Sequence, residues 1–131
     1  MSPKSITLNL GGLVFLLFAY WQFNDQSQYG NTDAWAWIVI YTLSAILSFS
    51  CATSYVRPAV LYIWFGFTIG ALTFRLQDDQ GNFDLSRLDP SKIWNQDQTL
   101  MIQNSNESSG LLILVCWALL MLYLNNNHRE K

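Results

Sequence analysis

The amino-acid sequence predicts an all-α integral membrane protein, a bundle of four transmembrane helices. The first observation is composition: only 12% of the 131 residues are charged and 51% are hydrophobic, whereas an ordinary soluble domain carries about 25% charged residues. The second is position, because four long runs contain no charged residue at all. The length allows one domain, residues 1–131, whose only long extramembrane segment is the loop 75–107.

Each uncharged run has the length of a membrane-spanning helix. The runs contain 20, 23, 17 and 21 residues, and a helix needs about 20 predominantly apolar residues to cross a hydrocarbon core of roughly 30 Å. Buried helices of a large soluble protein are the alternative, but 131 residues hold too little polar sequence to cover four of them. We expect the helices at Ile6–Phe23, Asp33–Cys51, Pro58–Phe74 and Ser108–Asn125.

The orientation follows from the basic residues near the helix ends. The first run follows Lys4 as a signal peptide would, but Ala19–Phe23 offers no small-residue cleavage site, so we expect a permanent helix. One side of the membrane would hold Lys4, Arg57, Arg129 and Lys131, and the other Arg75, Arg87 and Lys92. We therefore expect an integral protein of a plasma membrane, of the bacterial inner-membrane type, with both termini in the cytoplasm.

Composition also excludes several classes of site. A net charge of -2 with so few charged residues excludes a disordered chain and a nucleic-acid-binding protein. Two cysteines and one histidine leave no disulfide scaffold and no metal or cofactor motif. Cys51 and Cys116 would differ in depth by roughly 15 Å, and a disulfide requires Cα atoms within about 7 Å. We expect two buried thiols.

The loop between the third and fourth helices contains a second helical signal. Asp89-Pro90 is typical of a helix start, with an N-cap acid before proline at the first helical position. Apolar residues then recur on one stripe, which predicts a short amphipathic helix at Pro90–Ile102 on the outer membrane surface or capping the bundle. A partly ordered loop is the alternative. The oxygen-rich segment Asp78–Asp84 is only weakly similar to a calcium loop, and we expect a solvated turn.

Two helix starts carry capping signals. Asn104–Glu107 has the spacing of a capping box, with Asn in the place of Ser or Thr, and Glu107 would face the positive end of the helix dipole. Asn31-Thr32-Asp33 offers a comparable N-cap before the second helix.

Small residues predict how two of the helices pack. Helix association in lipid needs close packing rather than the hydrophobic effect. The third helix carries Gly66 and Gly70 as a G-x-x-x-G motif, and the second carries Ser44 and Ser48 at the same spacing. Because a short turn joins these helices, we expect the two stripes to face each other inside one subunit. Dimerisation through Gly66 and Gly70 is the alternative.

Polar residues at the outer helix ends are the candidate functional site. They would converge at the outer rim of the bundle, and ionisable residues at membrane depth usually face a cavity or each other. One interpretation is a structural pairing of Arg75 with Asp25 or Glu107; the other is a pair of carboxylates around a cation or a substrate amine. The candidate ligand-binding residues are Gln22, Asn24, Asp25, Tyr41, Arg75 and Glu107.

Three sequence motifs are similar to those of a known protein family. Gln22-Phe23-Asn24-Asp25, the W-x-x-x-Y-T segment Trp37–Thr42 and the E-x-x-G-L segment Glu107–Leu111 resemble the transmembrane protein 220 family, small four-helix membrane proteins. Two departures matter: the family often has Arg just before that Glu, where this chain has Asn106, and the loop before the fourth helix is longer here. The resemblance implies the four-helix fold and marks Asn24, Asp25 and Glu107 as positions to test. It implies no reaction.

The residues favour a non-enzymatic function. No nucleophile, metal or phosphate motif is present in the sequence, and we name no catalytic residue. We expect a subunit or accessory factor of a larger membrane protein assembly, with the lipid bilayer and membrane-protein subunits as partners. The alternative is a binding or transport site for a small ligand, lipid or cation at the outer rim. An intramembrane enzyme ranks third.

Overall fold

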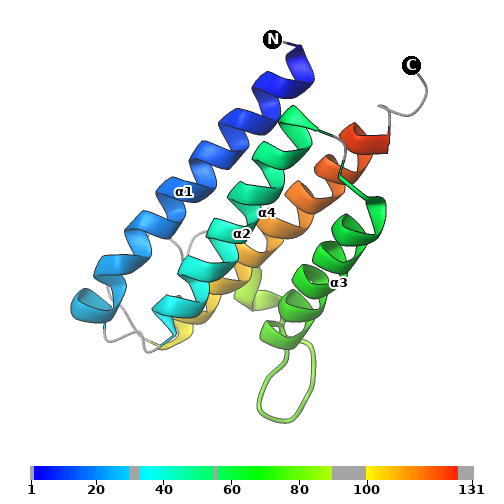
Figure 1. The fold of residues 1–131 in the computed structure, drawn as a ribbon. Coiled ribbons are helices and arrows are strands. Elements are labelled where there is room, and N and C mark those ends of the chain that lie inside the picture. The colour runs from blue at the N-terminus through cyan, green and yellow to red at the C-terminus, as the bar shows by residue number, and fades with distance from the viewer. Residues whose placement is uncertain (1, 30–32, 55, 90–99, 127–131) are drawn as a thin grey trace. The chain divides into compact units, whose positions relative to one another are not determined.

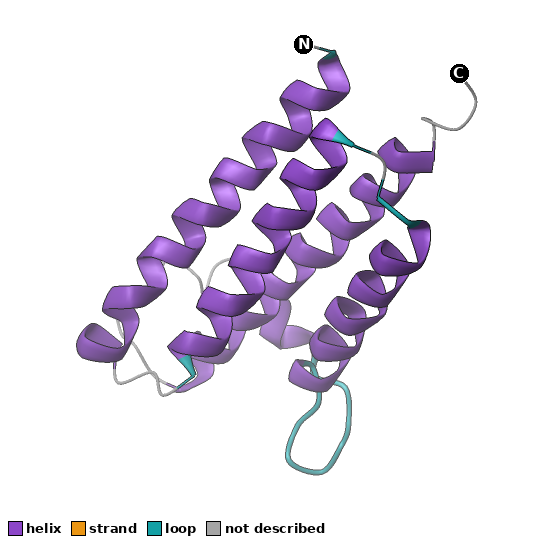
Figure 2. Cartoon of the chain, in the orientation of Figure 1, coloured by secondary structure: helices purple, strands orange, loops and turns teal. Residues whose placement is uncertain are grey.

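Four α-helices make up most of the chain. The computed structural model describes residues 2–29, 33–54, 56–89 and 100–126, and it describes no side chains within 24–29 and 100–106. The helices are α1 (Pro3–Tyr29), α2 (Ala34–Thr53), α3 (Pro58–Arg75) and α4 (Leu100–Asn126), with a short 3-10 helix, η1 (Leu85–Leu88), between α3 and α4 (Figure 1). Within these described ranges no strand is present (Figure 2).

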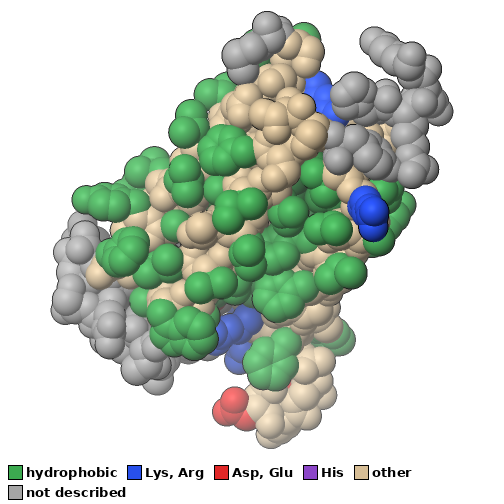
Figure 3. Space-filling view, viewed as in Figure 1, with side chains coloured by type: hydrophobic (Ala, Val, Ile, Leu, Met, Phe, Trp, Pro, Cys, Tyr) green, Lys and Arg blue, Asp and Glu red, His purple; other side chains and the backbone are tan. Residues whose placement is uncertain are grey.

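Each α-helix contains a segment long and apolar enough to cross a membrane. These segments are Pro3–Phe23, Ala34–Thr53, Pro58–Arg75 and Glu107–Asn126, which confirms the all-α class and the four predicted spans. Exposed hydrophobic side chains are spread over the helices (Figure 3). In water such a surface would be unfavourable, but in a bilayer it faces acyl chains.

Two helices extend beyond their apolar segments. α1 continues to Tyr29, so Gln22, Asn24 and Asp25 lie inside the helix and do not close it as predicted. α4 begins at Leu100, so Glu107 lies two turns inside the helix and the predicted capping box at Asn104–Glu107 is wrong. The reason is that charge marks where a helix leaves the membrane, whereas a helix ends where a breaker intervenes, and neither extension contains Gly or Pro.

The remaining expectations about helix ends have mixed outcomes. Asp33 occupies the N-cap position of α2, and its carbonyl accepts hydrogen bonds from Ala36 and Trp37 N–H, but its side chain makes no cap hydrogen bond. Most of the predicted amphipathic helix lies outside the described residues, and Leu100–Ile102 belong to α4. The 3-10 helix was not predicted.

The chain divides into two compact units. The first comprises Met1–Pro58 together with Tyr123–Lys131, and the second comprises Ala59–Leu122. The single domain expected from the length stays a prediction.

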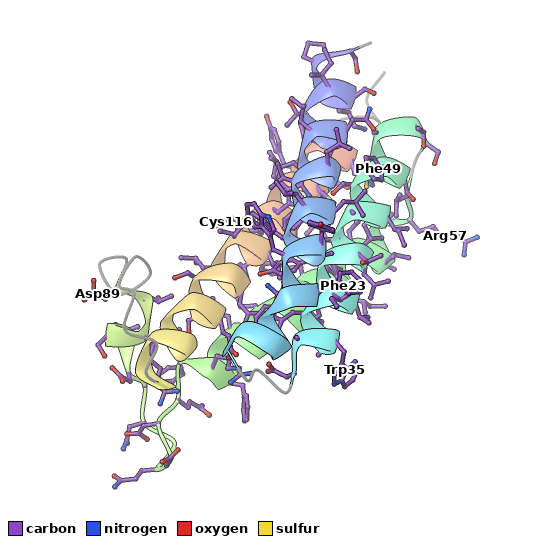
Figure 4. The ribbon with its side chains drawn as sticks, turned by 90° about the vertical axis from the view of Figure 1, so that its left-hand side faces the viewer. Phe23, Trp35, Phe49, Arg57, Asp89 and Cys116 are labelled. Atoms are coloured by element: carbon purple, nitrogen blue, oxygen red, sulfur yellow. The ribbon has the colours of Figure 1, made fainter. Side chains whose placement is uncertain are left out.

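In the first unit, α1 and α2 lie side by side and run in opposite directions (Figure 1). The buried residues of α1 recur every three to four positions, at Leu8, Gly12, Phe15 and Ala19, which is one face of a helix. Gly12 permits the closest approach, since a Cβ atom there would lie only 2.6 Å from Cε1 of Phe49 on α2. Arg57, after α2, extends away from both helices (Figure 4).

The last turn of α4 also belongs to the first unit, and one of its residues is tied to the segment that follows α2. Asn125 is completely buried. Its Nδ2 donates to the Val56 carbonyl at 2.8 Å, and its Oδ1 accepts from Val56 N–H at 3.3 Å. A buried side-chain amide that satisfies both backbone groups of one residue holds that segment in place.

In the second unit, α3 has one buried and one exposed face. Its buried residues are Leu61, Trp64, Thr68 and Leu72, again three to four residues apart. Cys51 in the first unit is buried as predicted, but Cys116 on α4 is exposed, which corrects the expectation of two buried thiols. Cys116 lies off the stripe formed by Leu111, Leu114 and Ala118, and therefore on the exposed side of α4.

Candidate functional site

An ion pair at the membrane boundary is the centre of the candidate site. Nη1 of Arg75, the last residue of α3, lies 2.8 Å from Oε2 of Glu107 on α4. The Glu107 side chain is 7% exposed and that of Arg75 is 32% exposed. Both residues terminate apolar spans, where an ionised carboxylate requires a cation. The structural pairing of Arg75 with Glu107 predicted from the sequence is therefore present.

Ser108, the residue that follows Glu107 on α4, has an unsatisfied hydroxyl. The residue is completely buried, and its Oγ has no hydrogen-bond partner. Most buried polar groups are hydrogen-bonded, so an exception beside a buried carboxylate needs an explanation. Sequence reasoning missed Ser108 because a serine in an apolar helix usually bonds to its own backbone.

Arg87 ties the loop after α3 to the end of that helix. Its Nη1 donates to the carbonyls of Arg75 at 2.9 Å and Gln77 at 2.8 Å, and its Nε lies 3.6 Å from Oδ2 of Asp84. A cation at a helix C-terminus satisfies carbonyls that have no partner inside the helix. The sequence shows Arg87 only as one basic residue in a loop, and no pattern there indicates this role.

A short hairpin turn follows α3. Gln77 pairs with Phe83 in an antiparallel bridge, and Gly81 adopts a φ of 83° while its N–H donates to the Asp78 carbonyl. The Asp78 carboxylate accepts hydrogen bonds from the N–H groups of Gln80 and Asn82 and from the Asn82 side chain.

These hydrogen bonds explain the electrostatics of Asp78. The backbone N–H of Asn82 above all, and then that of Gln80, hold the pKa of the Asp78 carboxyl below its ordinary value. The side chain thus acts as a turn residue, which supports the solvated-turn interpretation over a calcium loop. Across the part of the chain that the structure describes, no three His, Cys, Asp or Glu side chains gather as metal ligands would.

Tyr41 is a packing residue of the first unit. It is 7% exposed, and its ring stacks on Phe15 with centroids 6.1 Å apart and lies 5.7 Å from Trp37. Trp37 and Tyr41 are four residues apart on α2, so the W-x-x-x-Y spacing brings two rings together on one helix face. A packing role accounts for this motif without a ligand.

The six candidate ligand-binding residues therefore have different outcomes. The structure brings Arg75 and Glu107 together. Gln22 is half-buried on α1 and Tyr41 is buried on α2, whereas the side chains of Asn24 and Asp25 lie outside the described part. Convergence of all six at one rim stays a prediction.

The small-residue stripes also differ from each other. Ser44 and Ser48 are completely buried, and the Ser48 hydroxyl donates to the Ser44 carbonyl at 2.7 Å. Gly66 and Gly70 are exposed, and nothing lies within 4 Å of a Cβ atom built on either. The two stripes lie in different units, and their pairing stays a prediction.

The spans and the boundary ion pair define a class, that of small multi-pass α-helical membrane proteins. Within that class, residues 14–123, well over half of the chain, match the family described as Transmembrane family 220, helix, and the chain belongs to it. This confirms the resemblance found in the three sequence motifs. No curated protein and no solved structure matches the chain.

Proposed function

We propose that this protein is a non-enzymatic subunit or accessory factor of a larger membrane protein assembly. The observation that carries the proposal is the exposed face of α3 around Gly66 and Gly70, where nothing lies within 4 Å of the position that a Cβ atom would take. Small residues four apart let a second helix approach until the backbones touch, and such contacts drive helix association in lipid. The face has the geometry to receive a helix of a partner subunit.

The ion pair supports the same proposal. The Glu107 carboxylate is the only acidic side chain that the structure buries within a described span, and Arg75 neutralises it. A general base needs an accessible carboxylate within reach of a substrate proton. A carboxylate engaged by arginine serves instead to hold α3 and α4 together at the membrane surface.

Purification of the tagged chain from its native membrane in mild detergent tests this proposal. We expect a stoichiometric partner protein by native mass measurement, and its loss when Gly66 and Gly70 are both changed to Leu. The matched control is Ile63→Leu with Ile69→Leu, which alters two other exposed positions of α3 at constant volume. A wild-type chain that purifies alone, or only as a homodimer, would contradict the proposal.

One observation favours a second candidate, a binding or transport site for a small ligand, lipid or cation at the outer rim. It is the unpartnered Ser108 hydroxyl beside Glu107, a donor that a polar ligand could engage. The discriminating variant is Asp25→Asn with Glu107→Gln. If this variant folds, assembles and functions as the wild type does, the rim has no chemical role.

We also propose that both termini are cytoplasmic, in a plasma membrane of the bacterial inner-membrane type. The support is the basic residue distribution, with Lys4, Arg57, Arg129 and Lys131 on the side of the termini. Arg57 extends into the surroundings, as a residue at a membrane surface does (Figure 4).

A further inference from the structure

Two large apolar side chains are exposed in the polar loop that follows α3. Phe83 is 63% exposed and Leu85 is 69% exposed. The residue between them, Asp84, has extended backbone angles, φ −115° and ψ 91°. In an extended chain alternate side chains point to the same side, so Phe83 and Leu85 share one face of the loop and Asp84 takes the other.

The loop holds these side chains in a fixed position. Asp84 N–H donates to the Leu76 carbonyl at 2.7 Å, and Arg87 binds the carbonyls of Arg75 and Gln77. The Asp84 carboxylate also accepts from the backbone N–H and the hydroxyl of Ser86. Large apolar side chains that a loop holds exposed in fixed positions indicate a surface that contacts something else.

The depth of Phe83 and Leu85 relative to the membrane explains why they are exposed. Phe83 pairs with Gln77, two residues beyond the end of α3, and at about 3.3 Å per extended residue it lies at most about 7 Å outside the helix end. Asp84 is bonded to Leu76, so Leu85 lies about level with that end. The headgroup region of a bilayer is roughly 5–7 Å deep on each side, which covers both side chains.

The apolar surface continues from the spanning helix into this loop. Phe74, in the last turn of α3 and within the Pro58–Arg75 span, is 73% exposed, as a side chain in contact with lipid would be. Asp79 and Gln80 lie at the tip of the hairpin, which continues beyond the end of α3 and so reaches into water (Figure 1). Aromatic and aliphatic side chains at the level of the headgroups are typical of interfacial anchors.

We propose that the hairpin Gln77–Leu88 is an interfacial anchor that inserts Phe83 and Leu85 into the lipid headgroup region beside α3. The lipid bilayer covers these two side chains, because they lie at interfacial depth and continue the exposed apolar surface of α3. The anchor fixes how deeply the outer end of α3 sits, and with it the depth of the Arg75–Glu107 ion pair. The proposal is independent of any partner subunit.

Fluorescence quenching in phosphatidylcholine vesicles tests the proposal. Single cysteines placed at Phe83, Leu85 and, as the matched control, Gln80 are labelled with an environment-sensitive dye in the full-length chain, and the signal of the parent chain with its two native cysteines is subtracted. We expect lipid spin-labelled near the headgroup to quench the dye at 83 and 85 at least about twofold more than at 80, and aqueous iodide to show the opposite order. A dye at 83 as accessible to iodide as the dye at 80 would overturn the proposal and leave the face for a protein partner.

A second measurement covers the case in which labelling disturbs the hairpin. Phe83→Ser with Leu85→Ser is compared with Gln80→Ser, with unfolding followed in vesicles and in detergent. We expect the double variant to lower the stability in vesicles more than in detergent, whereas the Gln80 variant changes neither. Equal losses in the two environments would assign the side chains to protein packing and overturn the proposal.

Discussion

The Arg75–Glu107 pair is the residue-scale feature on which the second unit depends. Its carboxylate is almost fully buried and its guanidinium is partly exposed. Removing one partner of such a pair leaves a charge without compensation in a low-dielectric site. We expect Arg75→Gln to lower the free energy of unfolding by about 2–3 kcal/mol, below the largest losses for buried pairs because Arg75 is partly solvated. Denaturant unfolding in mixed micelles measures this.

A second prediction concerns the replacement of both residues of the ion pair. Replacement of a buried ion pair by apolar residues of similar volume is often close to neutral, so Arg75→Leu with Glu107→Leu should recover most of the stability that Arg75→Gln loses. Arg57→Gln is the control, because Arg57 is exposed, and it should change the stability by less than about 0.5 kcal/mol. If Arg75→Gln behaves like Arg57→Gln, the ion pair does not stabilise the fold.

Asp78 makes the hairpin sensitive to pH. Hydrogen bonds from backbone N–H groups lower the pKa of its carboxyl in the folded protein. A lowered pKa means that the carboxylate stabilises the turn at all pH values above the ordinary Asp pKa of about 3.9. This contribution is lost as the pH falls below that value and through the lowered pKa of the folded state.

The titration can be followed by NMR in micelles. We expect the carboxyl carbon of Asp78 to titrate with a midpoint below the ordinary Asp value, and the Asn82 amide signal to shift with the same midpoint. Asp78→Asn should abolish the shift of the Asn82 amide. A midpoint at the ordinary value would show that the carboxylate does not hold the turn.

At the residue scale, the sequence predicted a contact that depends on charge alone, but it did not predict a contact that depends on the path of the loop. Glu107 beside an apolar run needs a cation, and Arg75 ends the preceding run, so their pairing was one of the two pairings predicted, the other being Arg75 with Asp25. The role of Arg87 depends on a turn that brings it back over the end of α3. Nothing in the order of the loop residues specifies that return.

At the scale of elements, Gly12 determines how closely α1 and α2 approach. A Cβ atom on Gly12 would lie 2.6 Å from the Phe49 ring, so even one methyl group must displace that ring. We expect Gly12→Ala to destabilise the first unit by about 1–3 kcal/mol, the usual cost of overpacking. Phe49→Leu should recover part of the loss in the double variant, because it removes the ring edge that the methyl group meets.

The matched control for this prediction is a glycine in open space. Gly66→Ala meets nothing within 4 Å and replaces a glycine inside a helix, so in the isolated protein we expect a gain of about 0.5–1 kcal/mol. Thermal unfolding of the two variants in the same detergent compares them directly. Equal effects at positions 12 and 66 would contradict close packing at Gly12.

The elements themselves were predictable to different degrees. Runs without charge located all four membrane segments to within a few residues, because the cost of a charge in hydrocarbon decides where a span can lie. The ends of α1 and α4 were not predictable from charge, since polar residues such as Gln26 and Gln103 continue a helix as well as apolar ones do. Gly12 was missed because the pair Gly11-Gly12 in an apolar run does not indicate which glycine meets a neighbouring helix.

At the scale of the whole molecule, a chain that crosses the membrane four times would have position 2 on one side and position 80, after three crossings, on the other. The basic residues then decide which side is the cytoplasm. Ser2→Cys and Gln80→Cys report the two sides, since both positions are exposed in the structure. We expect a membrane-impermeant maleimide to label position 80 in intact cells and position 2 only after permeabilisation.

The native cysteines make the parent chain the control for this measurement. Cys51 is buried, and Cys116 is exposed on a face of α4 inside the Glu107–Asn126 span, so neither meets the water that the reagent needs, and the parent chain should stay unlabelled. Labelling of positions 2 and 80 from the same side would contradict four spans, because only an odd number of crossings between the two positions separates them. Labelling of position 2 alone in intact cells would keep the four spans but reverse the orientation. The asymmetry of basic residues would then be too small to direct insertion, and the buried Glu107 carboxylate would sit at the cytoplasmic surface.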